Sequence, residues 1–148
     1  MTTKCISSVH VRAARQPDLE EMLGIEQACF SNAPWDAESL TRYDCAVAEI
    51  DCIVRGFLIS RELVPNYEGL GGEREILNLA VNPRWRRQGI ARALLEYEIG
   101  RGGTLFLEVR NSNAAAQSLY KSCGFIEIGR RDDYYQSPSE TAIVMRLK

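Results

Sequence analysis

The spacing of apolar residues over the first third of the chain predicts one strand and two helices. Residues 9–13 alternate between apolar and polar side chains, as in a short strand, and apolar side chains then recur at helical spacing over residues 19–30. The break at residues 32–34 contains a proline, which separates this helix from the next. Asp36 can accept hydrogen bonds from backbone N–H groups two or three residues later, so we expect it to cap a second, short helix.

Three strands are predicted next. Apolar and β-branched residues over 45–48 and 53–59 predict two antiparallel strands, with the turn between them at residues 49–51. The glycine-rich residues 65–72 form a loop that is longer than most connections, and a strand follows at residues 75–81.

The second half of the chain alternates helices with strands. A helix is predicted to start at Ile90, after a basic stretch, and to stop at the glycines that begin with Gly100. The further expected elements are a strand at 104–109, a turn at 110–113, a helix at 114–123, and strands at 125–134 and 141–147. This order of elements predicts an α/β fold, with a mixed sheet and helices on both faces.

The composition is that of an ordinary globular chain. With 148 residues, of which 45% are hydrophobic and 26% charged, there is room for one domain, residues 1–148. The 18 Lys and Arg residues nearly cancel the 20 Asp and Glu residues, so we expect no direct nucleic-acid partner. No stretch approaches the roughly 20 apolar residues that span a bilayer, and no secretory pattern opens the chain. We therefore expect a cytoplasmic protein that has no membrane contact.

The cysteine and histidine content excludes several kinds of site. Five cysteines, scattered from Cys5 to Cys123, fit neither a disulfide framework nor a zinc site. The chain has a single histidine, His10. One imidazole is too few to build a metal centre from histidines, and it does not indicate a serine-type triad. We expect no metal, and we interpret Cys123 as a packing residue.

The segment of residues 77–92 carries the clearest chemical signal. It predicts a strand that runs into a Gly-containing turn at the start of a helix, where free backbone N–H groups and the helix dipole suit a phosphate or pyrophosphate. Arg86, Arg87 and Arg92 would add positive charge. Since neither G-K-[ST] nor G-x-G-x-x-G is present, the predicted anion is not a P-loop nucleotide. The alternative is that the arginines form a solvated face.

Two motifs at this point resemble a known family. Arg86-x-x-Gly89-x-Ala91 resembles the (Gln/Arg)-x-x-Gly-x-(Gly/Ala) acetyl-CoA signature of the GNAT N-acetyltransferases, and residues 105–125 resemble the strand and helix that complete its cofactor site. Over most of the chain the likeness is to the RimI group, the ribosomal-protein alanine N-acetyltransferases. The cues for this group are Ile25-Glu26-Gln27, Pro34-Trp35, residues 107–110 and residues 130–135. The resemblance implies the GNAT fold, a mixed and mostly antiparallel central sheet of about six to seven strands with helices on both faces.

The resemblance also implies a cofactor, acetyl-CoA, and the residues that bind it. The pantetheine arm would run along the backbone of Leu79, Ala80 and Val81 and be held by the Asn113 side chain. The pyrophosphate would lie on Arg87, Gln88, Gly89, Ile90, Ala91 and Arg92.

The implied reaction needs a base and an acid. A neutral amine must attack the thioester, and an α-amino group with a pKa of about 8 needs only a modest base. In the pattern of the group Glu108 is that base, Tyr120 protonates the departing thiolate, and the Val81 N–H stabilises the oxyanion. The alternatives are that Glu108 is a strand residue paired with Arg110 or another arginine, and that Tyr120 is a core aromatic.

The acceptor side is indicated by residues that flank the acceptor groove in the family fold: Glu26, Trp35, Tyr134 and Tyr135. Each aromatic residue among them has packing as its alternative role. Two segments depart from the group, since the connection 96–104 is shorter and the loop 65–72 longer. The shorter connection shortens the cofactor-binding helix without touching the pyrophosphate turn, whereas the longer loop borders the acceptor groove of the family fold and so bears on the substrate.

The leading hypothesis is an acetyl-CoA-dependent N-acetyltransferase that acts by direct transfer in a ternary complex. Its acceptor would be a protein N-terminal α-amine, with the N-terminal alanine of a ribosomal protein as the expected partner. The alternatives are a GNAT enzyme for a small-molecule amine and a non-catalytic module that binds acetyl-CoA. The sequence predicts no oligomeric state.

Overall fold

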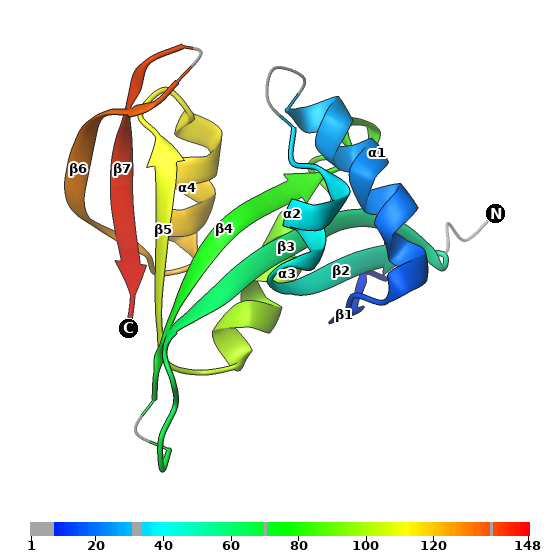
Figure 1. The fold of residues 1–148 in the computed structure, drawn as a ribbon, viewed down its shortest axis with the longest axis horizontal. Coiled ribbons are helices and arrows are strands. Elements are labelled where there is room, and N and C mark those ends of the chain that lie inside the picture. Colours follow the sequence, from blue (N-terminus) through cyan, green and yellow to red (C-terminus); the bar gives the residue numbers. More distant parts are fainter. Residues whose placement is uncertain (1–7, 31–33, 70, 137) are drawn as a thin grey trace, which may run out of the picture. The chain divides into compact units, whose positions relative to one another are not determined.

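A seven-stranded sheet with strand order β1-β2-β3-β4-β5-β7-β6 organises the chain (Figure 1). The computed structural model describes residues 8–30, 34–69, 71–136 and 138–148. The strands are β1 His10–Ala13, β2 Asp44–Ile50, β3 Ile53–Val64, β4 Glu73–Val81, β5 Thr104–Arg110, β6 Ile126–Tyr135 and β7 Glu140–Leu147. The expectations for Cys5, for residues 32–33 and for Leu70 lie outside the described residues.

Within the described residues, four α-helices accompany the sheet. They are α1 Leu19–Cys29, α2 Ala37–Thr41, α3 Ile90–Gly100 and α4 Ala114–Ser122, and two 3-10 turns occur at Gln16–Asp18 and Pro83–Trp85. The expected mixed sheet with helices is confirmed, and the predicted cap is present because the Ser39 N–H donates to Asp36 Oδ1 at 2.8 Å. The described part of the chain contains no helix both long and apolar enough to cross a membrane.

One turn lies later than predicted. Glu49 and Ile50 remain in β2, and the chain reverses at Asp51 and Cys52, whose φ angles are 53° and 64°. A two-residue turn with positive φ at both positions matches the twist of the two flanking strands, whereas a turn at residues 49–51 would remove Glu49 and Ile50 from β2. The prediction failed because a cysteine is an unusual residue in the left-handed region.

The described residues form two compact units. The first is Met1–Leu58 with Leu79–Leu94, and the second is Ile59–Asn78 with Leu95–Lys148. The expectation of a single domain stays a prediction.

In the first unit, strands are covered on both faces. Helices α1 and α2 lie on one face, and the start of α3 lies on the other (Figure 1). Gly56 of β3 allows this second contact, because a Cβ there would come within 2.9 Å of both Ala80 O and Ile90 Cγ2. The next residue, Phe57, is fully buried on the opposite face.

In the second unit, the two faces of β5 differ in burial, since one is buried and the other half-exposed. Leu105, Leu107 and Val109 are buried, whereas Phe106, Glu108 and Arg110 alternate with them on the other face. The strand pairs with β7 antiparallel and with β4 in parallel, Glu73–Ile76 of β4 lying opposite Thr104–Leu107. A parallel neighbour requires a crossover, and α3 lies in it.

Candidate functional site

The chain leaves β4 through a turn that several contacts hold in place. The Asn82 N–H donates to Arg55 O at 2.7 Å, and Asn82 Oδ1 accepts from the Arg84 N–H at 3.0 Å. The Arg55 guanidinium carbon lies 4.1 Å from the centre of the Trp85 ring. The 3-10 turn Pro83–Trp85 is thereby attached to β3 before α3 begins.

The next residues form an open turn at the N-terminus of α3. Arg87 and Gly89 have positive φ angles of 62° and 80°, and no atom lies within 4 Å of where a Gly89 Cβ would be. The first helical bond runs from the Ala93 N–H to Gly89 O at 3.0 Å. The N–H groups of Ile90 and Ala91 precede that bond and face the turn, at the positive end of the helix dipole. Exposed Arg87, Gln88 and Gly89 therefore border a surface suited to an anion.

The end of β4 lies beside the end of α1 in the same unit. Ala80 is buried, whereas Leu79 and Val81 are half-buried. The Cys29 thiol donates to Val81 O at 3.2 Å, and Arg86 Nη2 lies 3.6 Å from Cys29 Sγ. All of the residues predicted to bind pantetheine and pyrophosphate, except Asn113, thus belong to the first unit.

Glu108 lies in the second unit and has two polar partners. Its side chain is 12% exposed, and Oε1 lies 3.2 Å from Arg131 Nε. The hydrogen bond of the Tyr134 hydroxyl with Glu108 is the largest cause that raises the pKa of Tyr134 above its ordinary value. The alternative reading of Glu108 holds in part, because an arginine does pair with it, but that arginine is Arg131 of β6.

Arg110, the other candidate partner, is engaged elsewhere. Arg110 Nη1 lies 3.2 Å from Glu140 Oε2, and its guanidinium carbon lies 4.4 Å from the centre of the Tyr135 ring. Hydrogen bonds from Ser112 hold the pKa of Glu140 below its ordinary value. Glu140 and Tyr135 thereby keep Arg110 beside the β6–β7 connection.

Tyr120 is buried in α4, with 8% of its surface exposed. Burial raises the pKa of Tyr120 to about 12, so its hydroxyl stays protonated at neutral pH. The ring also packs against Phe125, with 5.9 Å between ring centres. Burial raises the pKa of Tyr135 to about 12 as well, and Glu108 and Tyr120 both add to that rise. Glu108, Tyr120 and Tyr135 are therefore electrostatic neighbours within one unit.

Asn113 caps α4. Its Oδ1 accepts from the Ala116 N–H at 3.1 Å. A hydrogen bond through the side-chain oxygen leaves the Nδ2 amide as the donor for any bound group.

The residues expected on the acceptor side lie in both units. In the first unit Glu26 is 1% exposed, and its Oε1 accepts from the Trp35 N–H at 3.2 Å. Trp35 packs with Tyr43 at 6.3 Å between ring centres. In the second unit Tyr134 and Tyr135 meet edge to face at 5.1 Å, and 47% of Tyr134 is exposed.

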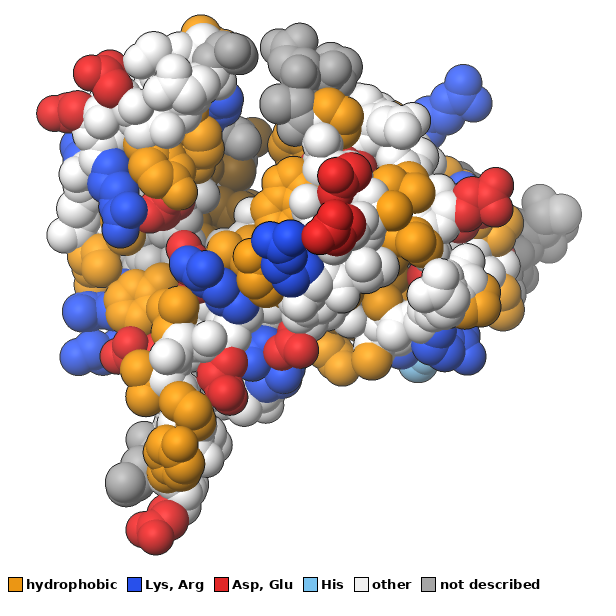
Figure 2. All heavy atoms as spheres, viewed as in Figure 1, with side chains coloured by type: hydrophobic (Ala, Val, Ile, Leu, Met, Phe, Trp, Pro, Cys, Tyr) orange, Lys and Arg blue, Asp and Glu red, His pale blue; other side chains and the backbone are white. Residues whose placement is uncertain are grey.

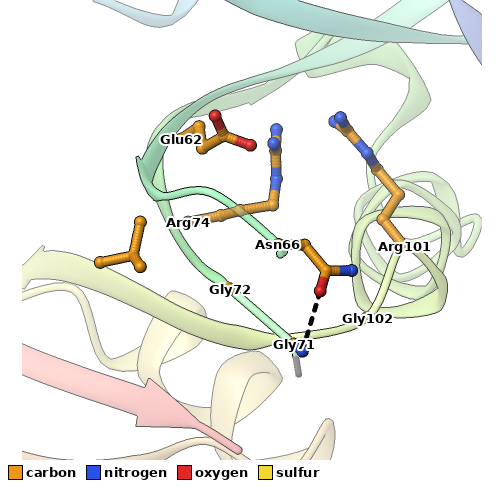
Figure 3. A pocket seen from close by; sticks show the side chains of 8 residues that line it. Glu62, Asn66, Gly71, Gly72, Arg74, Arg101 and Gly102 are labelled. Atoms are coloured by element: carbon orange, nitrogen blue, oxygen red, sulfur yellow. Dashed lines mark hydrogen bonds between the residues drawn. The ribbon is translucent and has the colours of Figure 1, made fainter. Parts of the chain in front are cut away.

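A pocket of about 140 Å³ lies at the loop end of the β3–β4 hairpin, beside Arg101 and Gly102 (Figure 3). The Arg74 side chain lines it and pairs with buried Glu98 at 2.6 Å, while Arg101 approaches Glu98 at 3.4 Å. The Asn66 side chain accepts from the Gly71 N–H at 2.9 Å and closes the loop 65–72. None of the predicted site residues lines this pocket.

The charge distribution and the possible metal ligands add no further site among the described residues. Basic and acidic side chains are interspersed on the face shown in Figure 2, without a continuous field of one sign. Over residues 8–30, 34–69, 71–136 and 138–148, no group of three or more His, Cys, Asp or Glu side chains is placed to hold a metal ion.

Sequence reasoning missed two parts of this arrangement. It assigned nothing to Arg131, although that residue stands in the 130–135 cue, and it did not predict the Arg74–Glu98 pair. Glu98 occurs in a helix among other charged residues, a pattern that ordinarily indicates an exposed face.

Comparison with known proteins gives consistent matches. A family profile described as an acetyltransferase (GNAT) domain matches residues 41–127. The ribosomal protein bS18-alanine N-acetyltransferase of Escherichia coli K12 is 49% identical over 82 residues, which cover 51% of this chain and 55% of that protein. The match thus spans about half the length of that relative. The protein of the same name from Haemophilus ducreyi is 36% identical over 146 residues, or 89% and 94% of the two chains.

A solved structure resembles the whole fold. The crystal structure of the ribosomal-protein-S18-alanine N-acetyltransferase from Escherichia coli has a TM-score of 0.81 and 34% identity. The alignment covers 95% of this chain and 93% of that one.

Proposed function

Because the chain belongs to the GNAT acetyltransferase family, we propose that it is an acetyl-CoA-dependent N-acetyltransferase that acts on a protein N-terminal α-amine. Transfer is direct, within a ternary complex of enzyme, acetyl-CoA and acceptor. The preferred acceptor is an N-terminal alanine, as on a ribosomal protein. The names of the relatives from Escherichia coli and Haemophilus ducreyi support this choice.

The observation that carries the proposal is the open turn before α3. Left-handed backbone at Arg87 and Gly89 and the free space at Gly89 leave the first N–H groups of α3 accessible. A pyrophosphate fits such a turn, since both the dipole and the arginine charge favour it. Arg87, Gln88, Gly89, Ile90, Ala91 and Arg92 are the residues that would hold it.

The end of β4 and the cap of α4 supply the remaining contacts to acetyl-CoA. The backbone of Leu79, Ala80 and Val81 runs along the pantetheine arm, and Asn113 Nδ2 donates to one of its carbonyl groups. When bound, acetyl-CoA supplies the acetyl group as a thioester. Val81 offers its N–H to the oxyanion, and little reorganisation is needed because the next residue, Asn82, is bonded through its N–H to Arg55 O of β3.

Glu108 and Tyr120 perform the proton transfers. Glu108 accepts a proton from the α-ammonium of the acceptor, directly or through a water molecule, and this leaves a neutral amine. The Tyr120 hydroxyl donates to the departing sulfur. Its raised pKa of about 12 supports the role of donor, because the proton is held on the oxygen over the whole physiological range.

The family resemblance assigns Glu26, Trp35, Tyr134 and Tyr135 to the acceptor side, where Glu26 is itself buried and acts only through its neighbours. Exposed Tyr134 and half-buried Tyr135 offer hydroxyl groups to a peptide backbone. The buried Glu26 carboxylate holds the backbone of Trp35 through its N–H, and the Trp35 ring packs against Tyr43.

Mass spectrometry of acceptor panels tests the proposal. The purified protein is incubated with acetyl-CoA and peptides that begin with Ala, Ser, Gly or Met, with the same peptides blocked at the α-amine, and with small amines. We expect acetylation of free peptide α-amines, fastest with Ala, and none of the blocked peptides. The Glu108→Gln variant serves as the control for non-enzymatic transfer.

Two results would overturn the proposal in different ways. Acetylation of small amines alone would replace the acceptor class and keep the family chemistry. Tight acetyl-CoA binding with no transfer to any acceptor would identify a binding module.

A further inference from the structure

Arg131 reaches Glu108 across a strand that separates them. Glu108 belongs to β5 and Arg131 to β6, and β7 lies between these strands (Figure 1). In the two registers Ala142 of β7 pairs with both Arg110 and Arg131, whereas Glu108 pairs with Val144. The Arg131 side chain therefore extends diagonally over β7 to bring Nε to 3.2 Å from Glu108 Oε1.

The two ends of this ion pair differ greatly in exposure. The side chain of Glu108 is 12% exposed and that of Arg131 is 60% exposed. An ion pair with so exposed a cation adds at most about 1 kcal/mol to stability. The small gain in folding stability therefore does not account for an arginine at position 131. A nearly buried carboxylate that takes part in a reaction, by contrast, needs partners that fix its orientation.

Arg131 also touches the other partner of the carboxylate. The Tyr134 hydroxyl shares a hydrogen bond with Glu108, and the Arg131 guanidinium carbon lies 5.6 Å from the centre of the Tyr134 ring. One arginine therefore borders both groups and can keep carboxylate and hydroxyl together.

The other charged side chains around this cluster have partners of their own. Arg110 of β5 pairs with Glu140, and Glu75 of β4 pairs with Arg61 at 2.7 Å. The remaining titratable neighbours, Tyr120 and Tyr135, are neutral below their pKa values of about 12. Among these described groups, Glu108 forms its ion pair with Arg131.

We propose that Arg131 is a positioning residue, which holds the Glu108 carboxylate in the orientation that receives a proton from the α-ammonium of the acceptor. This inference rests on the proposed function. Because most of the Arg131 side chain is in solvent, its substitution leaves the core intact. The proton passes from the acceptor nitrogen to a Glu108 oxygen, and Arg131 neither gains nor loses one.

Steady-state kinetics with a peptide acceptor test this role. In Arg131→Gln we expect kcat to fall about tenfold, because a small misplacement of a reacting group is costly, while the KM for acetyl-CoA stays unchanged. Arg131→Lys keeps the charge and should recover most of the loss. The matched control is Arg130→Gln, since Arg130 is an equally exposed neighbour that pairs with Glu127 at 2.8 Å.

A second readout needs no catalysis and follows the Tyr134 hydroxyl. The ¹³Cζ signal of Tyr134 is titrated by NMR around the ordinary tyrosine pKa of about 10. If Arg131 positions Glu108, its loss loosens the Glu108–Tyr134 hydrogen bond, and the pKa of Tyr134 falls. If Arg131 is only a nearby charge, its loss raises the pKa of Tyr134, because the guanidinium lowers it in the intact protein.

The two readouts separate this inference from the proposed function. A fall in the pKa of Tyr134 together with a loss of kcat supports positioning. A rise in that pKa, or a kcat equal to that of Arg130→Gln, overturns it. If the wild-type protein acetylates nothing, the proposed function fails, and the direction of the Tyr134 titration still decides whether Arg131 positions Glu108.

Discussion

Strand alternation places Glu108 on the half-exposed face of β5, between the half-buried side chains of Phe106 and Arg110. The carboxylate is screened from most water yet paired with an exposed arginine and a tyrosine hydroxyl. This environment keeps a charged oxygen near the surface, where an ammonium group can approach. A fully buried carboxylate such as that of Glu26 lacks such access.

The first prediction concerns the Glu108 side chain. Glu108→Gln keeps the shape and the hydrogen bond with Tyr134 but removes the basic oxygen, so kcat should fall by about 10² to 10³-fold. The dissociation constant for acetyl-CoA, measured by isothermal calorimetry, should stay within about twofold. A variant that loses acetyl-CoA binding would show that Glu108 is not the base but part of the cofactor site.

Among the elements, those with local causes were predictable from sequence. The cap at Asp36, the start of α3 at Ile90 and the loop at 65–72 follow from a side-chain acceptor, a glycine turn and a glycine-rich run. Their causes lie within a few neighbouring residues.

The parts that were misplaced or left open depend on contacts between distant residues. The turn at Asp51–Cys52 is set by the register and twist of two strands. The partner of Glu108 is set by β7, which comes between β5 and β6 in the sheet although it follows both in the chain. No spacing within the sequence indicates that order of strands, so the prediction left the partner open as Arg110 or another arginine, and the structure shows Arg131.

The next prediction concerns Asn113, the cap of α4. Its side chain has two roles that variants can separate, because Oδ1 caps the helix and Nδ2 is the proposed donor to acetyl-CoA. Asn113→Asp keeps an oxygen at the cap position, and a carboxylate suits a helix N-terminus, so the free energy of unfolding should stay within about 0.5 kcal/mol. Asn113→Ala removes the cap and should cost about 1 kcal/mol in urea titrations. Both variants lack Nδ2 and should bind acetyl-CoA about tenfold more weakly.

The comparison between these two variants is decisive. Equal acetyl-CoA affinity of Asn113→Asp and the wild-type protein would leave Asn113 with the cap alone. Weaker binding only in Asn113→Ala would point to the position of α4 rather than to a bond from Nδ2.

On the scale of the whole molecule, each compact unit contains its own arginine–carboxylate pair beside its apolar core. In the first unit Arg12 holds Asp18 at 2.8 Å and keeps the pKa of that carboxyl below its ordinary value. In the second, Arg74 holds Glu98 at 2.6 Å and donates to Ser60 Oγ. Such pairs contribute little net stability but penalise arrangements that separate them.

A further prediction concerns the stability of the whole protein at alkaline pH. Burial raises the pKa of Tyr120 to about 12 from an ordinary value of about 10, so the folded state holds this proton more tightly than the unfolded state. The contribution of the Tyr120 hydroxyl to the free energy of unfolding is complete below about pH 10. About 2 kcal/mol of this contribution is lost as the pH rises toward 12. Tyr120→Phe should therefore lose less stability than the wild-type protein between about pH 10 and 12, as followed by urea unfolding.

The measurement has a built-in comparison. Tyr135, whose pKa is also raised to about 12, remains in the variant and should keep part of the alkaline loss. Identical pH dependence in both proteins would mean that the Tyr120 hydroxyl titrates as it does in the unfolded chain.

The parallel pairing of β4 with β5 has a consequence for the order in which the protein folds. The β2–β3 hairpin closes over a two-residue turn, so it can form within microseconds, whereas β5 meets β4 only after residues 82–103 have crossed over. Pulse-labelling hydrogen exchange should accordingly show the amides of Leu105 and Leu107 protected later than those of β2 and β3. Since Glu108 follows directly on this ladder, the proposed base would take its place among the last groups to be ordered.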